Sequence, residues 1–296
     1  MMAFEPAQQH QAAAPLQGPL FEGLLAEFAA CAMSAGITAL GAPNRALIFA
    51  AAARACGPFD SGPGRSHPIS VNALAASLAR PFETIRRQAN MLIDTGLLVR
   101  HETGLAVPLQ AICDPRAALM ADRCHDLLVR LVEDVRAANF MLSEPRPDIN
   151  YDPRTGIGIA FDLLLATIEC HHQRKENWTR LALIFAIEWA NRRFAHASGP
   201  YLAPVKPSTV ARILGLPYAT VSRNIEMLVA SAKLRPVPQG LVIAPDLITA
   251  PAATEARLAL ANRARQLLGR LSHIGFPLDR PARAYIDRRP PLPALG

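Results

Sequence analysis

Two stretches of the chain decide its fold: residues 74–87 read LAASLARPFETIRR, and residues 210–223 read VARILGLPYATVSR. In each stretch a short segment with apolar spacing ends just before a proline, and a second amphipathic segment follows it. Proline disfavours helical geometry in the residue before it and suits the first turn of a new helix. Each stretch therefore predicts a short helix, a tight turn and a longer helix.

The two stretches belong to a longer internal repeat. Residues 46–50 (ALIFA) recur unchanged as residues 182–186, and the same register continues without a gap to Gly104-Leu105 and Gly240-Leu241. Chance rarely keeps one register over such a length, so the sequence predicts an internal duplication. The predicted boundaries are a flexible N-terminal tail at 1–19, unit 1 at 20–140, a linker at 141–159, unit 2 at 160–275 and a Pro/Arg-rich C-terminal tail at 276–296.

Around each stretch the apolar spacing predicts the same series of elements. Ser70 suits an N-cap, and Gly96 suits the end of the longer helix. Apolar segments then flank His101–Gly104 as a short hairpin, and a second hairpin crosses Gly240. Pro236 and Pro238 are expected to weaken the second hairpin, since each removes a ladder donor. The predicted helices cover 21–33, a run from residue 43, 71–79, 82–95 and 117–140, then 161–173, 178–195, 208–214, 218–231 and 254–272.

A short helix, a tight turn, a longer helix and a hairpin are the elements of a winged helix-turn-helix, whose second helix enters the DNA major groove. The two quoted stretches resemble the helix-turn-helix of Crp/FNR-type regulators. This resemblance implies that Glu83, Thr84 and Arg87 face DNA in the first unit, and that Thr220 and Arg223 do so in the second.

The chain departs from the Crp/FNR pattern at several points. Phe82 and Tyr218 stand where that family usually has a basic residue, and Ala219 replaces the glutamate. No β-rich effector domain precedes either stretch. The layout of each unit is closer to MarR-type regulators, which dimerise through their outer helices. The predicted fold class is mainly α with small β-wings, as an internal duplication of two winged helix-turn-helix units flanked by outer helices.

Arg87 is the leading candidate for reading a base, because a guanidinium bonds both acceptors of a guanine edge. Glu83, one turn earlier, either accepts from a cytosine amine or orients Arg87. Hydroxyls near a helix N-terminus suit phosphates, and basic hairpin residues suit the backbone or minor groove. Alternatively, all of these are ordinary solvated side chains. The predicted DNA-binding residues are Glu83, Thr84, Arg86, Arg87, Asn90, Arg100, His101, Thr220, Ser222, Arg223, Asn224 and Arg235.

The charge balance favours a polyanionic partner. The 296 residues carry 31 basic and 24 acidic side chains, a net charge of +7 and a pI near 9.6. Residues 20–140 are neutral overall, whereas residues 160–280 carry the excess positive charge. Because phosphate neutralisation supplies much of DNA affinity, the second unit is expected to carry most of the non-specific attraction. The tail adds Arg280, Arg283, Arg288 and Arg289.

Other chemistry has little support in the sequence. The five cysteines form no C-x-x-C pair, which is typical of a reducing compartment and favours a cytoplasmic, nucleoid-associated protein. The nearest candidate for a membrane span, residues 28–42, is too short to cross a bilayer.

The Cys170-His171-His172 and Cys124-His125 groups are expected to be structural rather than metal ligands, and both tryptophans are expected to pack in the core. No nucleotide-binding or nucleophile motif is present, so we expect no cofactor, no metal and no enzyme activity.

These observations predict a sequence-specific transcription regulator that binds double-stranded DNA with two covalently linked winged helices. Transcription machinery or another regulator is a possible further partner, and the expected state is a monomer with pseudo-dimeric halves or a homodimer. Two alternatives stay open: a tandem winged-helix protein-interaction module, such as a chromosome-organising accessory subunit, and a plasmid-type replication initiator. The expected surface joining the units consists of Leu127, Leu128, Leu131, Leu267, Leu268 and Leu271.

Overall fold

The computed structural model describes residues 15–57, 67–144, 146, 148–171, 176–193 and 203–294. The first half contains α1 (Pro19–Leu40), α2 (Pro43–Cys56), α3 (Val71–Ser77), α4 (Phe82–Asp94), β1 (Val99–His101), β2 (Gly104–Ala106), α5 (Leu109–Ile112) and α6 (Pro115–Ala137). The second half contains α7 (Pro153–Cys170), α8 (Trp178–Arg193), α10 (Pro207–Leu214), α11 (Tyr218–Ala230), β3 (Leu234–Val237), β4 (Gly240–Ile243), α12 (Pro245–Thr249) and α13 (Pro251–His273). A 3-10 turn, η2 (Pro281–Ala284), follows.

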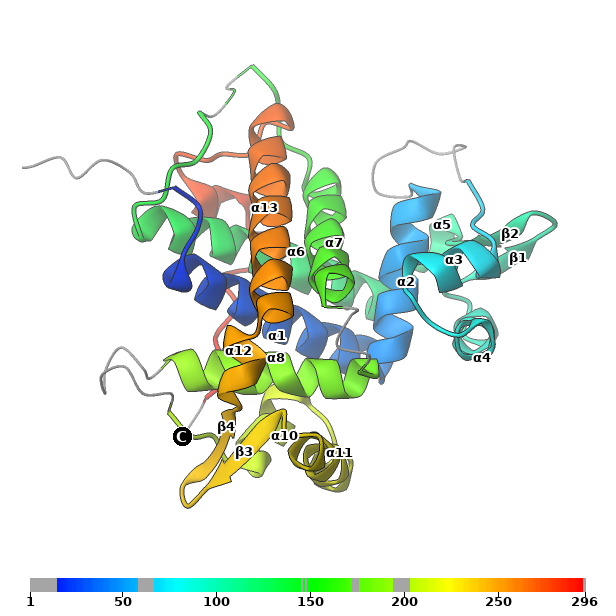
Figure 1. Cartoon of the computed structure of the whole chain (residues 1–296). Helices are drawn as coiled ribbons and strands as arrows, with labels where there is room; N and C mark the ends of the chain where they lie inside the picture. The colour runs from blue at the N-terminus through cyan, green and yellow to red at the C-terminus, as the bar shows by residue number, and fades with distance from the viewer. Residues whose placement is uncertain are drawn as a thin grey trace, which may run out of the picture.

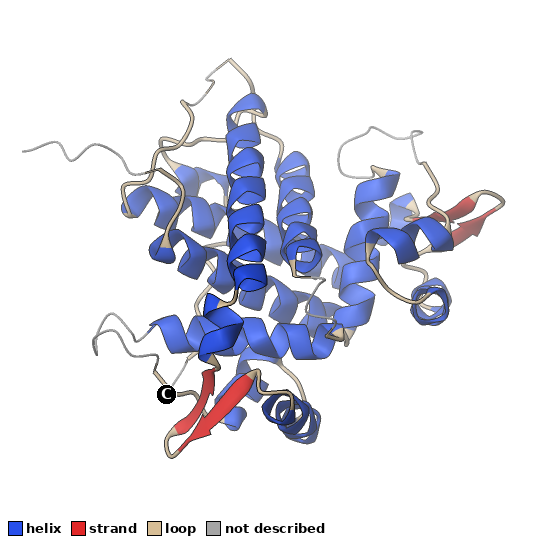
Figure 2. Ribbon diagram, viewed as in Figure 1, coloured by secondary structure: helices blue, strands red, loops and turns tan. Residues whose placement is uncertain are grey.

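The prediction of a mainly helical chain with small β-sheets is confirmed, since the only sheets among the described residues are the hairpins β1–β2 and β3–β4 (Figure 2). Ser70 is the N-cap of α3 and its hydroxyl accepts from the amide of Ala73 at 3.0 Å. Pro81 and Pro217 precede α4 and α11 with the same backbone angles, φ −56° and ψ 135°. Local sequence therefore determines where both longer helices begin.

Corresponding turns in the two halves share an unusual backbone conformation. The turn before α4 has Ala79 at φ 48°, and the turn before α11 has Gly215 at φ 64°. After α4 comes Gly96 at φ 77°, and after α11 comes Ala232 at φ 54°. Glycine adopts positive φ without steric cost. At one of these two positions each half therefore has an alanine where the other half has the better-suited glycine.

Both hairpins are closed by a glycine that lies against a third piece of backbone. An added Cβ on Gly104 would lie 2.5 Å from the carbonyl oxygen of Ile69, and one on Gly240 would lie 2.6 Å from that of Val205. Ile69 and Val205 bridge the outer edges of β2 and β4. Any larger residue would push this bridging segment away, which explains why both positions are glycine.

The expected weakening of the second hairpin is wrong: β3 and β4 pair over four residues each, against three for β1 and β2. Pro236 pairs with Leu241, whose amide and carbonyl both bond Val205 on the other side of β4. A residue opposite Leu241 therefore has no ladder bond to lose. Pro238 lies in the turn between the strands and removes no ladder donor either.

Six helices, α1, α2, α6, α7, α8 and α13, form the centre of the molecule (Figure 1). The first half's α1 packs against α8, and the second half's α7 packs against α2. Arg54 on α2 pairs with Asp162 on α7 through two contacts of 2.7 and 3.0 Å. Because the halves exchange their first helices in this way, they share one continuous hydrophobic core.

The two small groups attach to different edges of this centre. The group α3, α4, β1 and β2 lies beyond α2, and the group α10, α11, β3 and β4 lies below α8 (Figure 1). On the second group α1 adds a further contact, in which the Ser34 hydroxyl donates to the carbonyl of Ile213 at 2.7 Å. The bundle therefore holds the second group through two helices, α8 and α1.

The predicted joining surface is corrected by the structure. The outer-helix leucines of α6 and α13 are all buried, as expected for a core. However, α6 and α13 reach each other mainly through α7, which packs against both, and α1 contributes the largest contacts between the halves. The two predicted outer helices therefore do not join the halves by packing on each other; α6 reaches the second half through α7, and α1 reaches it through α8.

Two predicted boundaries also change. Helix α7 begins at Pro153, where Asp152 caps it by accepting from the amide of Arg154 at 2.9 Å, so part of the expected linker is helical. Helix α1 extends over 22 residues, and by length and composition it could cross a bilayer, unlike the shorter segment expected. It instead lies at the centre of the bundle, covered by α2, α6 and α8, which is the packing of a buried core helix.

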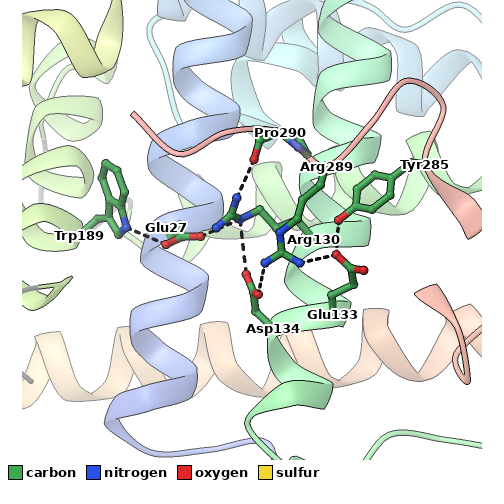
Figure 3. Close-up of polar contacts among 8 residues, drawn as sticks. All are labelled: Glu27, Arg130, Glu133, Asp134, Trp189, Tyr285, Arg289 and Pro290. Carbon is green, nitrogen blue, oxygen red and sulfur yellow. Dashed lines mark hydrogen bonds and ion pairs between the residues drawn. The ribbon is translucent and has the colours of Figure 1, made fainter. Parts of the chain in front are cut away.

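The C-terminal segment, expected to be a tail, is packed against the bundle as far as it is described. We call residues 276–294 the C-terminal strap. Phe276, Leu278 and Ala284 are buried, and Arg130 on α6 donates to the carbonyl of Pro290 at 2.6 Å (Figure 3). Arg289 pairs with Asp134 at 2.5 Å and with Glu133 (Figure 3). The strap therefore ties the end of the chain to the outer helix of the first half.

Asp126 on α6 is the main polar anchor of the strap. Its carboxylate accepts from the amides of Ile286, Asp287 and Arg288 at 2.8, 3.1 and 3.3 Å, and it contacts His125 Nδ1 at 3.1 Å. Burial opposes a low pKa, but the hydrogen bonds from His125 and the strap amides outweigh it and lower the pKa of Asp126 below its usual value. The contacts of the folded strap therefore favour the ionised form of the Asp126 carboxylate.

We predict that Asp126→Ala lowers the free energy of unfolding by about 2 kcal/mol at neutral pH, because it leaves three amides of the strap without their acceptor. Because the folded pKa is lowered, the contribution of Asp126 is present above the usual aspartate pKa and is lost as the pH falls through the folded value. The difference between wild type and Asp126→Asn should therefore hold at neutral pH and shrink below about pH 4. Urea unfolding across this range measures it.

Trypsin offers a local readout of the same change, since the bond after Arg288 lies in the anchored strap. Cleavage there should become faster in Asp126→Ala and stay slow in the control Asp279→Asn, which alters an exposed aspartate of the strap. Equal cleavage rates in both variants would show that Asp126 does not hold the strap.

Candidate nucleic-acid interface

Helix α4 has a buried face and a polar face, as its sequence predicts. Ile85, Ala89 and Leu92 are buried against the first half of the bundle. Five of the predicted residues, Glu83, Thr84, Arg86, Arg87 and Asn90, lie together on the other side and line one shallow recess of about 580 Å³. The predicted residues of the first helix-turn-helix therefore form a single surface.

Within this surface Glu83 pairs with Arg86, and not with Arg87 as one expectation had it. The Glu83 carboxylate accepts from Arg86 Nη2 at 2.8 Å and from Nε at 3.0 Å, because the two side chains are one turn apart on the same face. Arg87 is exposed and has no hydrogen-bond or ion-pair partner among the described residues. Arg87 is therefore the guanidinium of α4 that is available to a ligand.

The first hairpin is connected to α4 by a side-chain bond. Arg100 on β1 donates from Nη2 to the amide oxygen of Asn90 at 2.9 Å. His101, the last residue of β1, is exposed, and it pairs with Gly104 at the tip of the hairpin. The hairpin and the helix thus present one continuous polar edge, with Arg100 between them.

Helix α11 repeats this arrangement in the second half. Val221, Ile225 and Leu228 are buried, and Arg223 is exposed without a hydrogen-bond or ion-pair partner in the described part of the chain. Thr220 is exposed near the start of the helix.

The neighbouring polar residues of α11 bond within their own helix. Asn224 donates from Nδ2 to the carbonyl of Thr220 at 2.8 Å, and Ser222 donates to Glu226 at 3.4 Å. Arg235 is exposed on β3, beside the helix. The available guanidiniums of α11 and its hairpin are therefore Arg223 and Arg235.

Corresponding apolar residues are also exposed on both longer helices. Phe82 and Tyr218 begin α4 and α11, and Met91 and Met227 lie near their ends. Arg180 on α8 contacts the Met227 sulfur at 3.7 Å. Such side chains suit contact with apolar groups of a partner, for example thymine methyl groups.

A cluster that the sequence analysis missed joins the group around α4 to the group around α11. Glu176, only 7% exposed, precedes α8 and pairs with Arg180 Nε at 2.5 Å and with Lys233 Nζ. Arg80 donates from Nη2 to the Glu176 carbonyl at 2.5 Å, and its guanidinium lies 5.0 Å from the centre of the Trp178 ring. We call these five residues the Glu176 cluster.

The position of the Glu176 cluster gives it a structural consequence. Arg80 lies in the turn just before α4, and Lys233 lies just after α11. Burial lowers the pKa of Arg80, and the charge of Glu176 acts in the opposite direction to keep it protonated. The cluster therefore holds the start of one longer helix in a defined place relative to the end of the other.

Most of the strap arginines stay available, but one is engaged. Arg280 and Arg288 are mainly exposed, each 3.9 Å from the neighbouring aspartate. Arg283 is exposed too. Arg289, in contrast, is held by the acidic residues of α6, so it contributes less free positive charge than its sequence suggests.

The Cys-His groups have structural contacts. Cys124 is fully buried, and burial raises its pKa to about 12. His125 Nε2 lies 2.6 Å from the Tyr151 hydroxyl, and His171 Nδ1 lies 2.7 Å from the carbonyl of Thr167. His172 lies outside the described residues, and within them no group of three or more metal-ligating side chains is placed to hold an ion.

Comparison of the chain with protein-family models, curated proteins and solved structures finds no match.

Proposed function

We propose that the chain is a sequence-specific transcription regulator that binds double-stranded DNA through two winged helix-turn-helix units. The observation that carries this proposal is the equivalent placement of Arg87 and Arg223. Each projects without a partner among the described residues from the polar face of a helix whose opposite face is buried. In the winged-helix geometry this is the face that enters the major groove.

Several independent features support an origin of the two units by duplication. The bridges of Ile69 and Val205 to their hairpins, and the glycines facing them, occupy equivalent places. The positive-φ residues before and after each longer helix also correspond. A backbone repeated in such detail, under a repeated sequence, is expected of two copies of one unit.

In the proposed complex each free arginine bonds the two acceptors of a guanine edge, and each start of a longer helix lies near the DNA backbone. Thr84 and Thr220 lie in the first turn of α4 and α11, where a hydroxyl and helix amides reach phosphate. The Glu176 cluster holds the two readers in one arrangement. The chain therefore favours a DNA site with two half-sites at one spacing.

Selection from a random duplex library with the full chain tests this function. We expect enrichment of a two-part site, binding that weakens steeply as salt rises, and no comparable binding to single strands. If the selected duplexes share no common sequence, the proposal of sequence-specific binding is wrong. Enrichment of iterated copies of one half-site would favour the replication initiator instead.

A protein-interaction module is the second candidate, and one observation favours it. The recess on α4 contains Asp94 and the Glu83–Arg86 pair beside the exposed Met91, so this surface has no excess of positive charge. This candidate predicts that duplex binding depends on α11 alone, and that substitutions on α4 leave DNA affinity unchanged.

A further inference from the structure

A cavity of about 530 Å³ lies at an end of the bundle that carries neither α4 nor α11. Its apolar wall comes from Leu20, Gly23 and Leu24 on α1, Trp189 on α8 and Ile248 on α12. Leu20 is 45% exposed, although it lies at the start of a core helix. A cavity of this size with a mainly apolar wall has the dimensions of a small-molecule site.

Three arginines surround this apolar wall: Arg192 and Arg193 at the end of α8, and Arg257 on α13. Glu22 on α1 engages two of them, since its carboxylate lies 3.1 Å from Arg257 Nε and 3.6 Å from Arg192 Nη1. Arg192 also donates to Glu188 at 2.9 Å. The charges of Arg192 and Arg257 are therefore balanced by nearby carboxylates.

The other carboxylate of the cavity is balanced as well. Glu27 accepts from Trp189 Nε1 at 2.9 Å and from Arg130 Nε at 3.2 Å (Figure 3). These bonds fix the indole of Trp189 with its polar edge turned toward Glu27. The cavity therefore has a rigid aromatic wall and no carboxylate that lacks a cation.

Arg193 is the remaining charge. Its guanidinium lies 5.5 Å from the centre of the Trp189 ring, the side chain is exposed, and no carboxylate lies within ion-pair distance of it among the described residues. A cation stacked on an aromatic ring keeps its outward-facing donors free for an anion. The site thus offers an apolar wall next to one uncompensated positive charge.

We infer that this cavity binds an amphipathic carboxylate, with its apolar part against Leu20, Leu24 and Ile248 and its carboxylate on Arg193. A guanidinium and a carboxylate form two parallel hydrogen bonds, which orient the ligand as well as attract it. The site lies between α1 of the first half and α8, α12 and α13 of the second, so its ligand contacts both halves. It stands independently of DNA binding by α4 and α11.

Calorimetric titration of the full chain with naphthoate tests this site, and naphthamide is the uncharged probe of the same shape. We expect saturable binding of one naphthoate per chain and binding of naphthamide weaker by about tenfold or more, because the amide cannot form the charged pair. Naphthoate should also raise the unfolding temperature, since only the folded chain has the cavity.

Gly23→Leu separates occupation of the cavity from loss of the fold. Gly23 is helical and lines the cavity, and an added Cβ there would meet no atom within 4 Å, so a leucine side chain can start into the cavity. The matched control is Gly269→Leu on α13, where an added Cβ is equally free of contacts. Naphthoate binding should be lost in Gly23→Leu and kept in Gly269→Leu.

Arg193→Gln provides the electrostatic test. It should weaken naphthoate about tenfold while leaving naphthamide unchanged, because only the charged pair is removed. Absence of saturable naphthoate binding to the wild-type chain would overturn the proposal. Equal binding by Gly23→Leu and Gly269→Leu would overturn it too, because the ligand would then lie elsewhere.

Discussion

Replacing both Arg87 and Arg223 by alanine should reduce specific DNA affinity by roughly a hundredfold or more, the largest functional effect we expect. Each guanidinium is exposed and without an intramolecular partner among the described residues, so its removal costs no ion pair inside the protein. A bidentate contact to guanine is worth about 1–3 kcal/mol, and two distant contacts are expected to add. The measurement is competition binding to the selected two-part site and to random duplex.

Each single variant should relax the sequence preference in one half-site only, which distinguishes base reading from general attraction. Arg263→Ala is a matched control, because it removes an exposed arginine that lies on α13 and not on α4 or α11. It should change affinity for specific and random duplex by the same small factor. If the double variant bound the selected site as tightly as wild type does, Arg87 and Arg223 would not be the readers.

Among the substitutions that we propose, Glu176→Gln should cause the largest loss of stability. It should lower the free energy of unfolding by about 3 kcal/mol. Glutamine cannot balance Arg180 and Lys233, both of which are mostly buried beside Glu176. Breaking a buried ion pair by removing one charge leaves the other charges desolvated and uncompensated. Urea unfolding measures this loss against Glu255→Gln, an exposed position on α13 that should be nearly neutral.

The same substitution should affect DNA binding in a specific way. Because the Glu176 cluster lies between the start of α4 and the end of α11, its loss should weaken binding to two correctly spaced half-sites more than binding to one half-site. An equal loss on both DNAs, under conditions where the variant is folded, would show that the cluster does not set the spacing of the readers.

Local structure was largely predictable from the sequence. The N-cap Ser70, the starts of α4 and α11 after prolines, the buried faces of both helices and the positions of both hairpins agree with the structure. Each depends on residues only a few positions apart. The error about Pro236 arose because its effect depends on Val205, which pairs with the far edge of β4 and is distant in sequence.

The candidate interface was only partly predictable. Apolar spacing correctly placed the polar faces of α4 and α11, but it could not tell which of two adjacent arginines pairs with Glu83. That choice depends on side-chain geometry along the helix surface. The bond from Arg100 to Asn90 likewise depends on how the hairpin folds back on α4.

The sequence by itself determined the order of the elements, most of their ends and the faces that α4 and α11 bury, because caps, prolines and apolar spacing act within one or two helical turns. Only the tertiary structure decided how the halves exchange α1 and α7, where the strap binds and what Glu176 joins. Arg80 and Glu176 are 96 residues apart, and Asp126 and Ile286 are 160 apart. Contacts between such distant residues depend on the packing of the whole bundle, so no local pattern in the sequence records them.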